Sequence, residues 1–447
     1  MSEPLITVSG LRGIVGESLT PEVAVRYACS FATEAPEGAI IITRDGRATG
    51  EMLAEAIRVG LAAVGRDSID AGVAATPTTG VLVRHSRAAG GIQITASHNP
   101  PEYNGLKLFA ADGGVLSAAA GRKVLQRYRD GTAIAVLCDA PGLSRSLADT
   151  TNEHLGLVAA AVEVERIRRR RFRVLLDANH GSGSVLGRRL LEEFGCTVTV
   201  LGGEPDGRFA HPPEPTAENL AGVLRKVTEC GAEIGFCQDP DADRLAIVDE
   251  RGRYLGEEYT LAMCVDHVLR RRRGPIVTNC STSRMSQDLA ERYEVPFFRS
   301  AVGEANVVEV MRAKGAILGG EGNGGVIDSR VGFVRDSFIG MALVLEAMAE
   351  RGMSVGALAD ELPRYEIVKT RFTLGPERVA KALDALEKYF CDATADRLDG
   401  LRLDWHDKWL LVRASNTEPI IRAIAEAPIK SEAERLCAEA AEVVHGR

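Results

Sequence analysis

Three aspartates alternate within five residues of this sequence, at Asp239, Asp241 and Asp243. In an extended segment this spacing places three hard oxygen ligands on one side, and Mg²⁺ prefers such ligands. Carboxylates crowded together repel one another unless a cation or an arginine compensates them. The pattern therefore predicts a magnesium site rather than a solvated acidic turn.

An EF-hand calcium loop has a similar acidic alternation, and Glu250 falls at its twelfth position. That loop requires glycine at its sixth position, where this chain has Arg244. Strand-like segments, residues 234–237 and 245–248, also stand where an EF-hand has helices. We therefore reject the EF-hand interpretation.

A second reactive group is the hydroxyl of Ser97, which follows an apolar segment and has His98 beside it. An Asn-Pro-Pro turn at residues 99–101 would expose this hydroxyl as a nucleophile; the alternative is that Ser97 caps a helix or a turn. A glycine turn at Gly105 then returns Lys107 toward the same place. There the lysine could neutralise a phosphate or carry a proton, which favours the chemical interpretation.

Glycine dominates a third loop, residues 320–325, which reads Gly-Glu-Gly-Asn-Gly-Gly. Flexible positions around Glu321 and Asn323 suit hydrogen bonding to sugar hydroxyls, and a tight hairpin is the alternative. The spacing differs from a dinucleotide-binding fingerprint, and no helix starts directly afterward.

A fourth region has two arginines, Arg413 and Arg422, around residues 415–419, which read Ser-Asn-Thr-Glu-Pro. Two arginines with small side-chain donors and their backbone N–H groups are typical of a phosphate-binding nest. A helix capping box starting at residue 415 is the alternative, but its first turn would contain a proline. The candidate donors are Ser415, Asn416 and Thr417.

The elements that must position these loops form a repeated unit of apolar strand, small-polar loop and amphipathic helix. The unit begins near residues 39–43, 174–177 and 276–278, and each continues to a later strand that leads into one of the first three loops. Short apolar strands alternating with helices imply buried, mainly parallel sheets. We expect three similar α/β domains whose loops converge on one cleft.

The pattern changes after about residue 363 to an α+β arrangement. At 447 residues the chain is too long for one core, so several domains are expected. The predicted domains are residues 1–148, 149–250, 251–363 and 364–447. In the last we expect extended segments at 367–374, 401–403 and 409–412, and helices at 376–389 and 431–444.

Composition narrows the class of protein. A formal net charge of -8 argues against a nucleic-acid partner, so an anionic ligand must be held by locally placed Lys and Arg. The nine cysteines include no C-x-x-C pair, no signal peptide is recognisable, and no apolar run approaches the ~18 residues that span a bilayer. We expect a cytoplasmic protein with reduced thiols and no membrane partner.

Together the four loops resemble those of the α-D-phosphohexomutase superfamily, which includes phosphoglucomutase, phosphomannomutase and phosphoglucosamine mutase. They occur in that family's order and span the chain from end to end. The resemblance implies three similar mixed-sheet α/β domains plus a C-terminal α+β phosphate-binding domain around a central cleft. The glycine-rich loop and the Ser-Asn-Thr-Glu-Pro segment are most similar to the archaeal-type branch.

The resemblance also implies roles for individual residues. Residues 95–100 match the phosphoserine loop, 239–244 the magnesium loop, and 9–13 the family's opening motif. Arg12 would polarise the transferring group, and Lys107 is the first choice for general acid/base. The implied catalytic residues are Ser97, Lys107, Arg12, His98 and Arg244, the metal ligands are Ser97, Asp239, Asp241 and Asp243, and the substrate-binding residues are Glu321, Asn323, Arg413, Ser415, Asn416, Thr417 and Arg422.

The implied activity is interconversion of hexose 6-phosphate and hexose 1-phosphate. Phosphoserine would transfer its phosphoryl group to one sugar oxygen, giving a 1,6-bisphosphate that reorients and returns its other phosphate to Ser97. Mg²⁺ is the expected cofactor and hexose 1,6-bisphosphate the activator. A small-molecule sugar phosphate is the expected partner, the protein being a monomer or homodimer, and a hinge is expected near residue 364.

One position departs from the pattern, since many bacterial relatives carry histidine where this chain has Gly325. A base from that position is absent, so Lys107 or His98 must take its place. Glucosamine, glucose and mannose phosphates all stay open as substrates.

Two other functions remain to be weighed. A Mg²⁺-dependent sugar-phosphate phosphatase would share the phosphoserine chemistry but would not need a second phosphate anchor at residues 413–422. A catalytically inactive sugar-phosphate-binding protein is disfavoured because Ser97, the three aspartates and Lys107 are present together.

Overall fold

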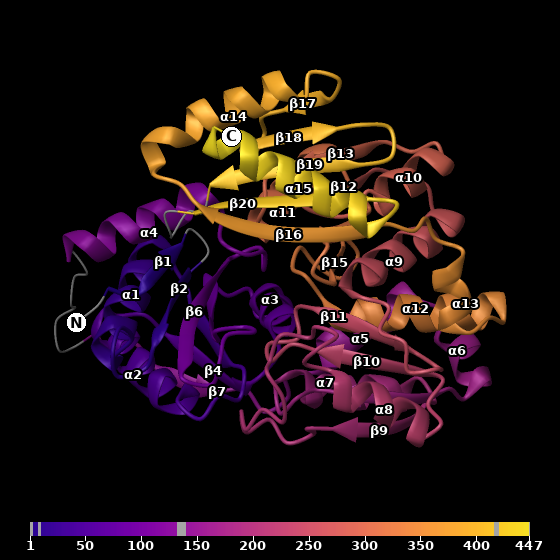
Figure 1. Ribbon diagram of the computed structural model, residues 1–447. Coiled ribbons are helices and arrows are strands. Elements are labelled where there is room, and N and C mark those ends of the chain that lie inside the picture. The colour runs from indigo at the N-terminus through magenta and orange to yellow at the C-terminus, as the bar shows by residue number, and fades with distance from the viewer. Residues whose placement is uncertain (1–2, 8–9, 132–139, 415–419, 447) are drawn as a thin grey trace.

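The computed structural model describes residues 3–7, 10–131, 140–414 and 420–446. Four β-sheets follow one another along the chain, as the change of colour from indigo to yellow in Figure 1 shows. The first three contain both parallel and antiparallel strands, and the last is antiparallel throughout. This arrangement confirms the fold class expected from the sequence.

The first sheet has seven strands in the order β1-β2-β6-β5-β3-β4-β7. Its interior strand β3 carries Ile40, Ile41 and Ile42, which are fully buried because helices cover both faces. Side chains alternate along a strand, so Ile41 packs on the side of α3 while its two neighbours pack on the side of α1 and α2. The elements are β1 (Leu5–Thr7), β2 (Gly10–Ile14), α1 (Pro21–Glu34), β3 (Ile40–Arg44), α2 (Gly50–Ala63), β4 (Ser68–Val73), α3 (Thr76–His85), β5 (Gly90–Ile94), β6 (Tyr103–Ala110), α4 (Ala118–Asp130) and β7 (Ser144–Ser146).

The second sheet has the order β11-β10-β8-β9 and the third the order β13-β12-β14-β15. The second unit contains α5 (Asn152–Ala161), α6 (Val164–Arg170), β8 (Arg173–Asp177), α7 (Gly183–Glu193), β9 (Thr197–Leu201), α8 (Ala221–Glu229), β10 (Ile234–Gln238) and β11 (Leu245–Asp249). The third contains α9 (Glu257–Arg271), β12 (Ile276–Asn279), α10 (Met285–Arg292), β13 (Phe297–Ser300), α11 (Glu304–Lys314), β14 (Leu318–Glu321), β15 (Gly325–Asp328), α12 (Ser337–Arg351) and α13 (Val355–Asp360).

The same four-strand arrangement recurs in all three sheets. β6-β5-β3-β4, β11-β10-β8-β9 and β15-β14-β12-β13 each contain three parallel strands and one antiparallel strand that returns beside the last of them. The first three predicted loops occupy the same turn in each repeat, between β5 and β6, β10 and β11, and β14 and β15. Loops that are far apart in the sequence therefore have the same place relative to the sheet of their own unit.

The second and third sheets share one continuous hydrophobic core. It runs from Phe236 of β10 through Leu261 of α9 to Phe338 of α12, all fully buried. α12 contacts α5, α6 and α7 as well as α9. The two units are therefore packed as one body across residue 250, which fixes the second loop relative to the third.

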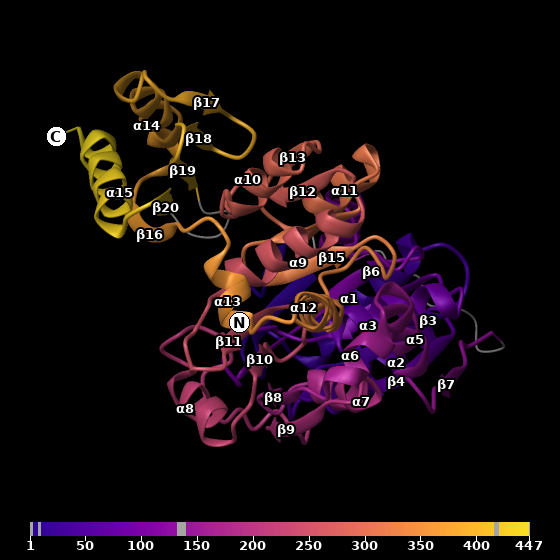
Figure 2. The ribbon, with the colours of Figure 1, turned by 90° about the vertical axis from the view of Figure 1, so that its right-hand side faces the viewer.

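The C-terminal sheet has the order β16-β20-β19-β18-β17 and its own core. Figure 2 shows it with α14 and α15 at one end of the molecule. β20 was not expected, because residues 413–422 had been interpreted as one continuous loop. The elements are β16 (Glu366–Thr373), α14 (Pro376–Tyr389), β17 (Thr394–Asp396), β18 (Leu401–Asp404), β19 (Trp409–Ala414), β20 (Ile420–Ala427) and α15 (Lys430–His445).

No helix in the described parts of the chain has both the length and the apolar character needed to cross a bilayer.

Candidate active site

The turn after β5 holds Ser97 in a strained conformation. Its φ is +49°, in the left-handed region that residues other than glycine seldom adopt. Arg47 supports this turn by donating hydrogen bonds to the carbonyl oxygens of Ser97 (2.7 Å), Asn99 (2.6 Å), Pro100 (2.6 Å) and Tyr103 (3.0 Å). A buried guanidinium thus fixes the backbone around the serine hydroxyl.

The Ser97 hydroxyl reaches across to the turn between β10 and β11. Its Oγ donates a hydrogen bond of 2.7 Å to Oδ2 of Asp239, and one carboxylate oxygen from each of Asp239, Asp241 and Asp243 lies within 4.8 Å of the others. Among the described residues, none donates a hydrogen bond to Oδ1 of Asp241 or Asp243, although both oxygens are buried. Three buried carboxylates with uncommitted oxygens fit the hard-ligand set of Mg²⁺.

Lys107 on β6 lies against the same carboxylates. Its Nζ is 2.9 Å from Oδ2 of Asp241 and 2.7 Å from Oδ2 of Asp243. Burial alone would lower the pKa of Lys107, but these two aspartates hold it above its ordinary value. The lysine therefore carries a proton, and its charge offsets part of the repulsion in the aspartate cluster.

Three further predicted residues surround Ser97. Arg12 Nη1 donates to Asn99 Oδ1 at 3.2 Å, and His98 Nδ1 lies 3.3 Å from Ser97 Oγ. Burial, with the charges of Arg244 and Arg12, lowers the pKa of His98 to about 3, so its imidazole is neutral at physiological pH. Arg244 lies close to the aspartates, with its Nε 3.9 Å from Asp243 and 4.0 Å from Asp239.

Glu250, the residue that matched an EF-hand, lies elsewhere. Its carboxylate accepts hydrogen bonds from Ser354 Oγ (2.8 Å) and the N–H of Gly356 (3.2 Å) at the start of α13. The aspartates lie in a turn between two antiparallel strands. Both observations support the rejection of an EF-hand.

The glycine-rich loop forms a tight turn between β14 and β15, so the hairpin interpretation describes its backbone correctly. Glu321 ends β14 and accepts hydrogen bonds from Asn279 Nδ2 (2.7 Å) and the N–H of Gly303 (3.1 Å). Asn323 Nδ2 lies 3.5 Å from Glu321 Oε2. The hairpin therefore also fixes the two polar side chains expected to contact a sugar.

Arg335 connects the aspartate cluster with the glycine-rich loop. Its Nη2 donates to Asp243 Oδ2 at 2.6 Å, and its Nη1 donates to Glu321 Oε2 at 2.7 Å. The same side chain passes over Gly325, where an added Cβ would lie only 2.3 Å from Arg335 Cδ. A side chain at position 325 would therefore displace the arginine that joins the two loops.

Three arginines form a row across the C-terminal sheet. Arg371 on β16 is directly opposite Arg422 on β20, which is directly opposite Arg413 on β19. Like charges directly opposite one another destabilise a sheet, and an anion would remove that cost. The other predicted members of this region, Ser415, Asn416 and Thr417, lie outside the described residues.

The arginine row faces the glycine-rich loop across a cavity of about 660 Å³. Its lining comes from the third unit on one side and the C-terminal sheet on the other. Glu214 also lines it and lies 4.0 Å from Arg244, so the cavity adjoins the aspartate cluster. The lining residues are Glu214, Glu258, Asn279, Ser281, Val302, Glu321, Gly322, Asn323, Lys369, Thr370, Arg371, Arg413, Ile420, Arg422 and Ile424.

The structure thus brings the predicted residues together in two adjoining groups. The first group surrounds the serine hydroxyl and contains Ser97, His98, Arg12, Lys107, Arg244 and the three aspartates. The second group lines the cavity and contains Glu321, Asn323, Arg413 and Arg422.

Sequence reasoning missed several neighbours of these groups. Lys369 and Arg371 are two residues apart in β16 and so share one face of the strand, which is a signal the sequence offers. Arg335 directly precedes Asp336, the N-cap of α12. Asn279 ends β12 and has no motif around it that points to the site. The missed residues are Arg47, Asn279, Arg335, Lys369 and Arg371.

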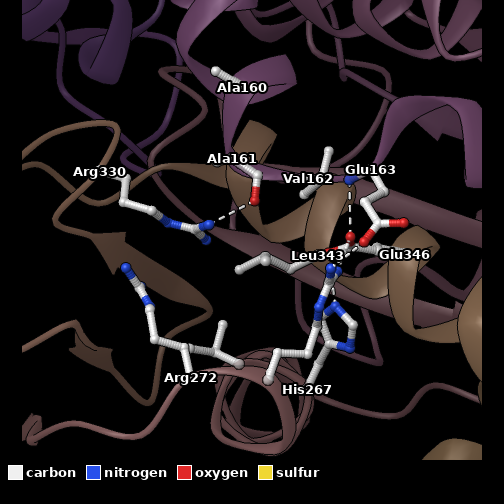
Figure 3. Close-up of a pocket in the computed structure, with 11 residues that line it drawn as sticks. Ala160, Ala161, Val162, Glu163, His267, Arg272, Arg330, Leu343 and Glu346 are labelled. Atoms are coloured by element: carbon white, nitrogen blue, oxygen red, sulfur yellow. Dashed lines mark hydrogen bonds and ion pairs between the residues drawn. The ribbon is translucent and has the colours of Figure 1, made fainter.

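A separate cavity of about 340 Å³ lies between the α5–α6 connection, α9 and α12 (Figure 3). Its charged groups pair with one another or with the backbone: His267 Nε2 lies 2.8 Å from Glu346, Arg271 also pairs with Glu346, and Arg330 donates to the carbonyl oxygen of Ala161 at 2.7 Å. Because these contacts join the second and third units, we interpret the cluster as structural.

Comparison with protein families gives four matches that cover most of the chain. Residues 4–134, 152–252 and 257–365 match the α/β/α domains I, II and III of phosphoglucomutase/phosphomannomutase, and residues 368–443 match the C-terminal domain of the same proteins. The exact domain boundaries stay a prediction.

Individual relatives are similar over nearly their full lengths. A "Phosphoglucomutase/phosphomannomutase" of Thermococcus kodakarensis is 38% identical over 95% of this chain and 94% of its own, and a "Probable phosphoglucosamine mutase" of the same organism is 32% identical over 98% and 97%. A phosphoglucomutase/phosphomannomutase family protein of Burkholderia thailandensis is 26% identical, with a TM-score of 0.86 over 99% of this chain and 98% of that one. The open form of a Paramecium phosphoglucomutase has the same fold, with a TM-score of 0.81 at 15% identity over 100% and 97%.

Proposed function

This chain belongs to the phosphoglucomutase/phosphomannomutase family and is a phosphohexomutase, and from that premise we propose that Ser97 carries the phosphoryl group it transfers. The reaction interconverts hexose 6-phosphate and hexose 1-phosphate through a hexose 1,6-bisphosphate. The contact between the Ser97 hydroxyl and Asp239 supports this proposal most directly. It brings a nucleophile next to the one buried carboxylate cluster suited to a divalent cation among the described residues.

In the first half-reaction a sugar hydroxyl oxygen forms a bond to phosphorus while the bond from that phosphorus to Ser97 Oγ breaks. In the second, Ser97 Oγ forms a bond to the other phosphorus of the bisphosphate while the bond from that phosphorus to the sugar oxygen breaks. In each half-reaction the attacking hydroxyl loses its proton and the departing oxygen takes up one, so no proton is gained or lost overall. Lys107 is our candidate for relaying it, because its protonated amine lies within 3 Å of two carboxylates beside Ser97. His98 is a weak base, given its lowered pKa.

Asp239, Asp241 and Asp243, with an oxygen of phosphorylated Ser97, are the proposed ligands of Mg²⁺. When bound, the ion supplies positive charge that stabilises the transferring phosphoryl group. Arg12 and Arg244 flank Ser97 and are proposed to contact the oxygens of the same group.

The second phosphate would bind at the arginine row. Arg371, Arg413 and Arg422 offer guanidinium donors on one side of the cavity, and Glu321 and Asn323 offer partners for sugar hydroxyls on the other. A bisphosphate that turns round in this cavity would present either phosphate to Ser97. Catalytic amounts of hexose 1,6-bisphosphate should therefore activate the unphosphorylated protein.

The cytoplasm is the compartment we propose, since the eight described cysteines are all free thiols.

The proposal is tested by following both products of the reaction. The purified chain, with Mg²⁺ and catalytic hexose 1,6-bisphosphate, should convert a hexose 6-phosphate into the 1-phosphate without releasing inorganic phosphate. Release of inorganic phosphate without isomerised sugar would instead identify a phosphatase.

A further inference from the structure

Glu258, the second residue of α9, reaches the turn that carries the proposed sugar ligands. Its carboxylate packs directly on Gly322, where an added Cβ would lie 1.9 Å from Oε1. Gly322 stands between Glu321 and Asn323, and all four residues line the 660 Å³ cavity. The carboxylate of Glu258 therefore occupies the space that a side chain at position 322 would need.

The other carboxylates of this cavity differ from Glu258 in their partners. Glu321 forms an ion pair with Arg335 at 2.7 Å, and Glu214 lies 4.0 Å from Arg244. Within the described ranges, no Lys or Arg forms an ion pair with Glu258, and its carboxylate accepts a hydrogen bond of 3.0 Å from the N–H of Ser283. Glu258 is thus available to a cation that the ligand brings.

We propose that Glu258 selects a 2-amino-2-deoxyhexose phosphate by pairing with the ammonium group of the sugar. The inference rests on the proposed function and narrows its substrate class. Phosphates need cationic partners, which the arginine row and Lys369 provide, and a sugar bearing only hydroxyls brings no charge to match a carboxylate. An ammonium group beside Glu258 provides that match, and a charge-assisted hydrogen bond is stronger than a neutral one.

The surroundings of Glu258 make the charge of its carboxyl group sensitive to a cation on the ligand. Burial raises its pKa to about 8, and the nearby Glu426 and Glu257 act in the same direction, while the N–H of Ser283 and the charge of Lys369 act against it. Without a cation beside it, the carboxyl group therefore takes up a proton near neutral pH. A bound ammonium group favours the charged form, which strengthens the pair.

The test compares glucosamine 6-phosphate with glucose 6-phosphate and mannose 6-phosphate as substrates of the full chain. Glu258→Gln keeps the shape of the side chain and removes its charge. We expect this variant to lose about 10- to 100-fold in kcat/KM for the amino sugar, mainly through KM, and less than about threefold for the two neutral sugars.

Glu257→Gln is the matched control, because Glu257 precedes Glu258 and lines a neighbouring cavity of about 470 Å³ instead. It should change kcat/KM for all three sugars by a similar factor. An equal loss for all sugars in Glu258→Gln, or a wild-type chain that does not prefer the amino sugar, overturns this inference alone. If the wild-type chain isomerises none of the sugars, the proposed function itself fails.

Discussion

The hydroxyl of Ser97 lies 2.7 Å from Oδ2 of Asp239, although 142 residues separate them in the sequence. Two equivalent turns of a repeated fold meet at this point. The contact is maintained from both sides, by Arg47 beneath the serine turn and by Thr76, whose hydroxyl donates to Asp241 at 2.6 Å.

Ser97→Ala should abolish mutase turnover, because Ser97 supplies the one hydroxyl among the described residues that donates to Asp239. A loss of about 10³-fold or more in kcat is expected, with the melting temperature nearly unchanged. Mass spectrometry should find one added phosphoryl group in the wild-type chain after treatment with hexose 1,6-bisphosphate, and none in the variant.

The control for this substitution is Ser117→Ala, which removes the hydroxyl that caps α4. It should cost about 1 kcal/mol of stability and leave turnover intact. Normal turnover by Ser97→Ala would refute the assignment of Ser97 as the phosphoryl carrier.

Adding Mg²⁺ should raise the melting temperature of the chain. The ion binds the folded state and offsets the repulsion among three buried carboxylates, so at 100 times its Kd it adds about 3 kcal/mol of stability. Thermal unfolding with MgCl₂ is compared with NaCl at the same ionic strength. Asp239→Asn should show a much smaller Mg²⁺ effect, and an identical effect in both proteins would contradict the predicted ligand set.

Gly325→Ala should impair catalysis without touching a substrate. The new Cβ would collide with Arg335, which holds Asp243 and Glu321 together, so a drop of about 10- to 100-fold in kcat/KM is expected. Gly156→Ala is the matched control, since a Cβ there meets no atom within 4 Å and sits in α5; it should stabilise the chain by about 0.5–1 kcal/mol. Full activity of Gly325→Ala would show that Arg335 tolerates displacement.

Arg371→Ala should weaken phosphate binding, although Arg371 is distant from Arg413 and Arg422 in the sequence. We expect KM for hexose phosphate to rise about 10- to 100-fold, because one donor of the row is lost. Inorganic phosphate should raise the melting temperature of the wild-type chain more than that of the variant. Arg378→Ala, on the exposed surface of α14, is the control; equal phosphate effects in all three proteins would remove the row from the binding site.

Glu346→Gln should destabilise the chain in a pH-dependent way. Burial alone would raise the pKa of Glu346, but hydrogen bonds from His267, the N–H of Glu163 and Arg271 lower it from 4.5 to about 2. The stabilisation is therefore complete above about pH 4.5 and is lost as the pH falls toward 2, because the unfolded chain then binds more protons than the folded one.

At pH 7 the lowered pKa of Glu346 in the folded chain corresponds to about 3 kcal/mol of stability. Urea unfolding at several pH values should show that this contribution decreases in acid. Glu350→Gln, one turn further along α12, has a more exposed carboxylate and should have a much smaller effect. A penalty for Glu346→Gln that stays constant between pH 7 and about pH 3 would contradict the assignment.

Much of the fold was predictable because its repeats are local in sequence. Each unit is recognisable from an apolar strand, a polar loop and an amphipathic helix within a few dozen residues. The same pattern predicts where the loops with Ser97, the aspartates and Glu321 lie. The arginine row and Arg335 were not predictable in this way. Arg371 meets Arg422 only through the register of β16 and β20, and Arg335 meets Asp243 across 92 residues through the packing of α12.

The missed strand β20 has the same explanation. Several of its residues alternate between buried and less buried positions. That alternation was overlooked because the polar motif at residues 413–422 had been interpreted as a loop. Where a binding motif continues directly into a strand, the same residues carry both patterns, and the motif can be recognised while the strand is missed.

The division of the hydrophobic cores has a consequence for how this protein can change over time. The C-terminal sheet, where we propose that the second phosphate binds, has a core of its own, while the second and third units share one. Substitutions in that sheet therefore need not disturb the units that hold the aspartate cluster and the glycine-rich loop. The proposed binding site for the distant phosphate can therefore change in evolution, or adapt to a new sugar, while the turn of Ser97 and the aspartate cluster stay unchanged.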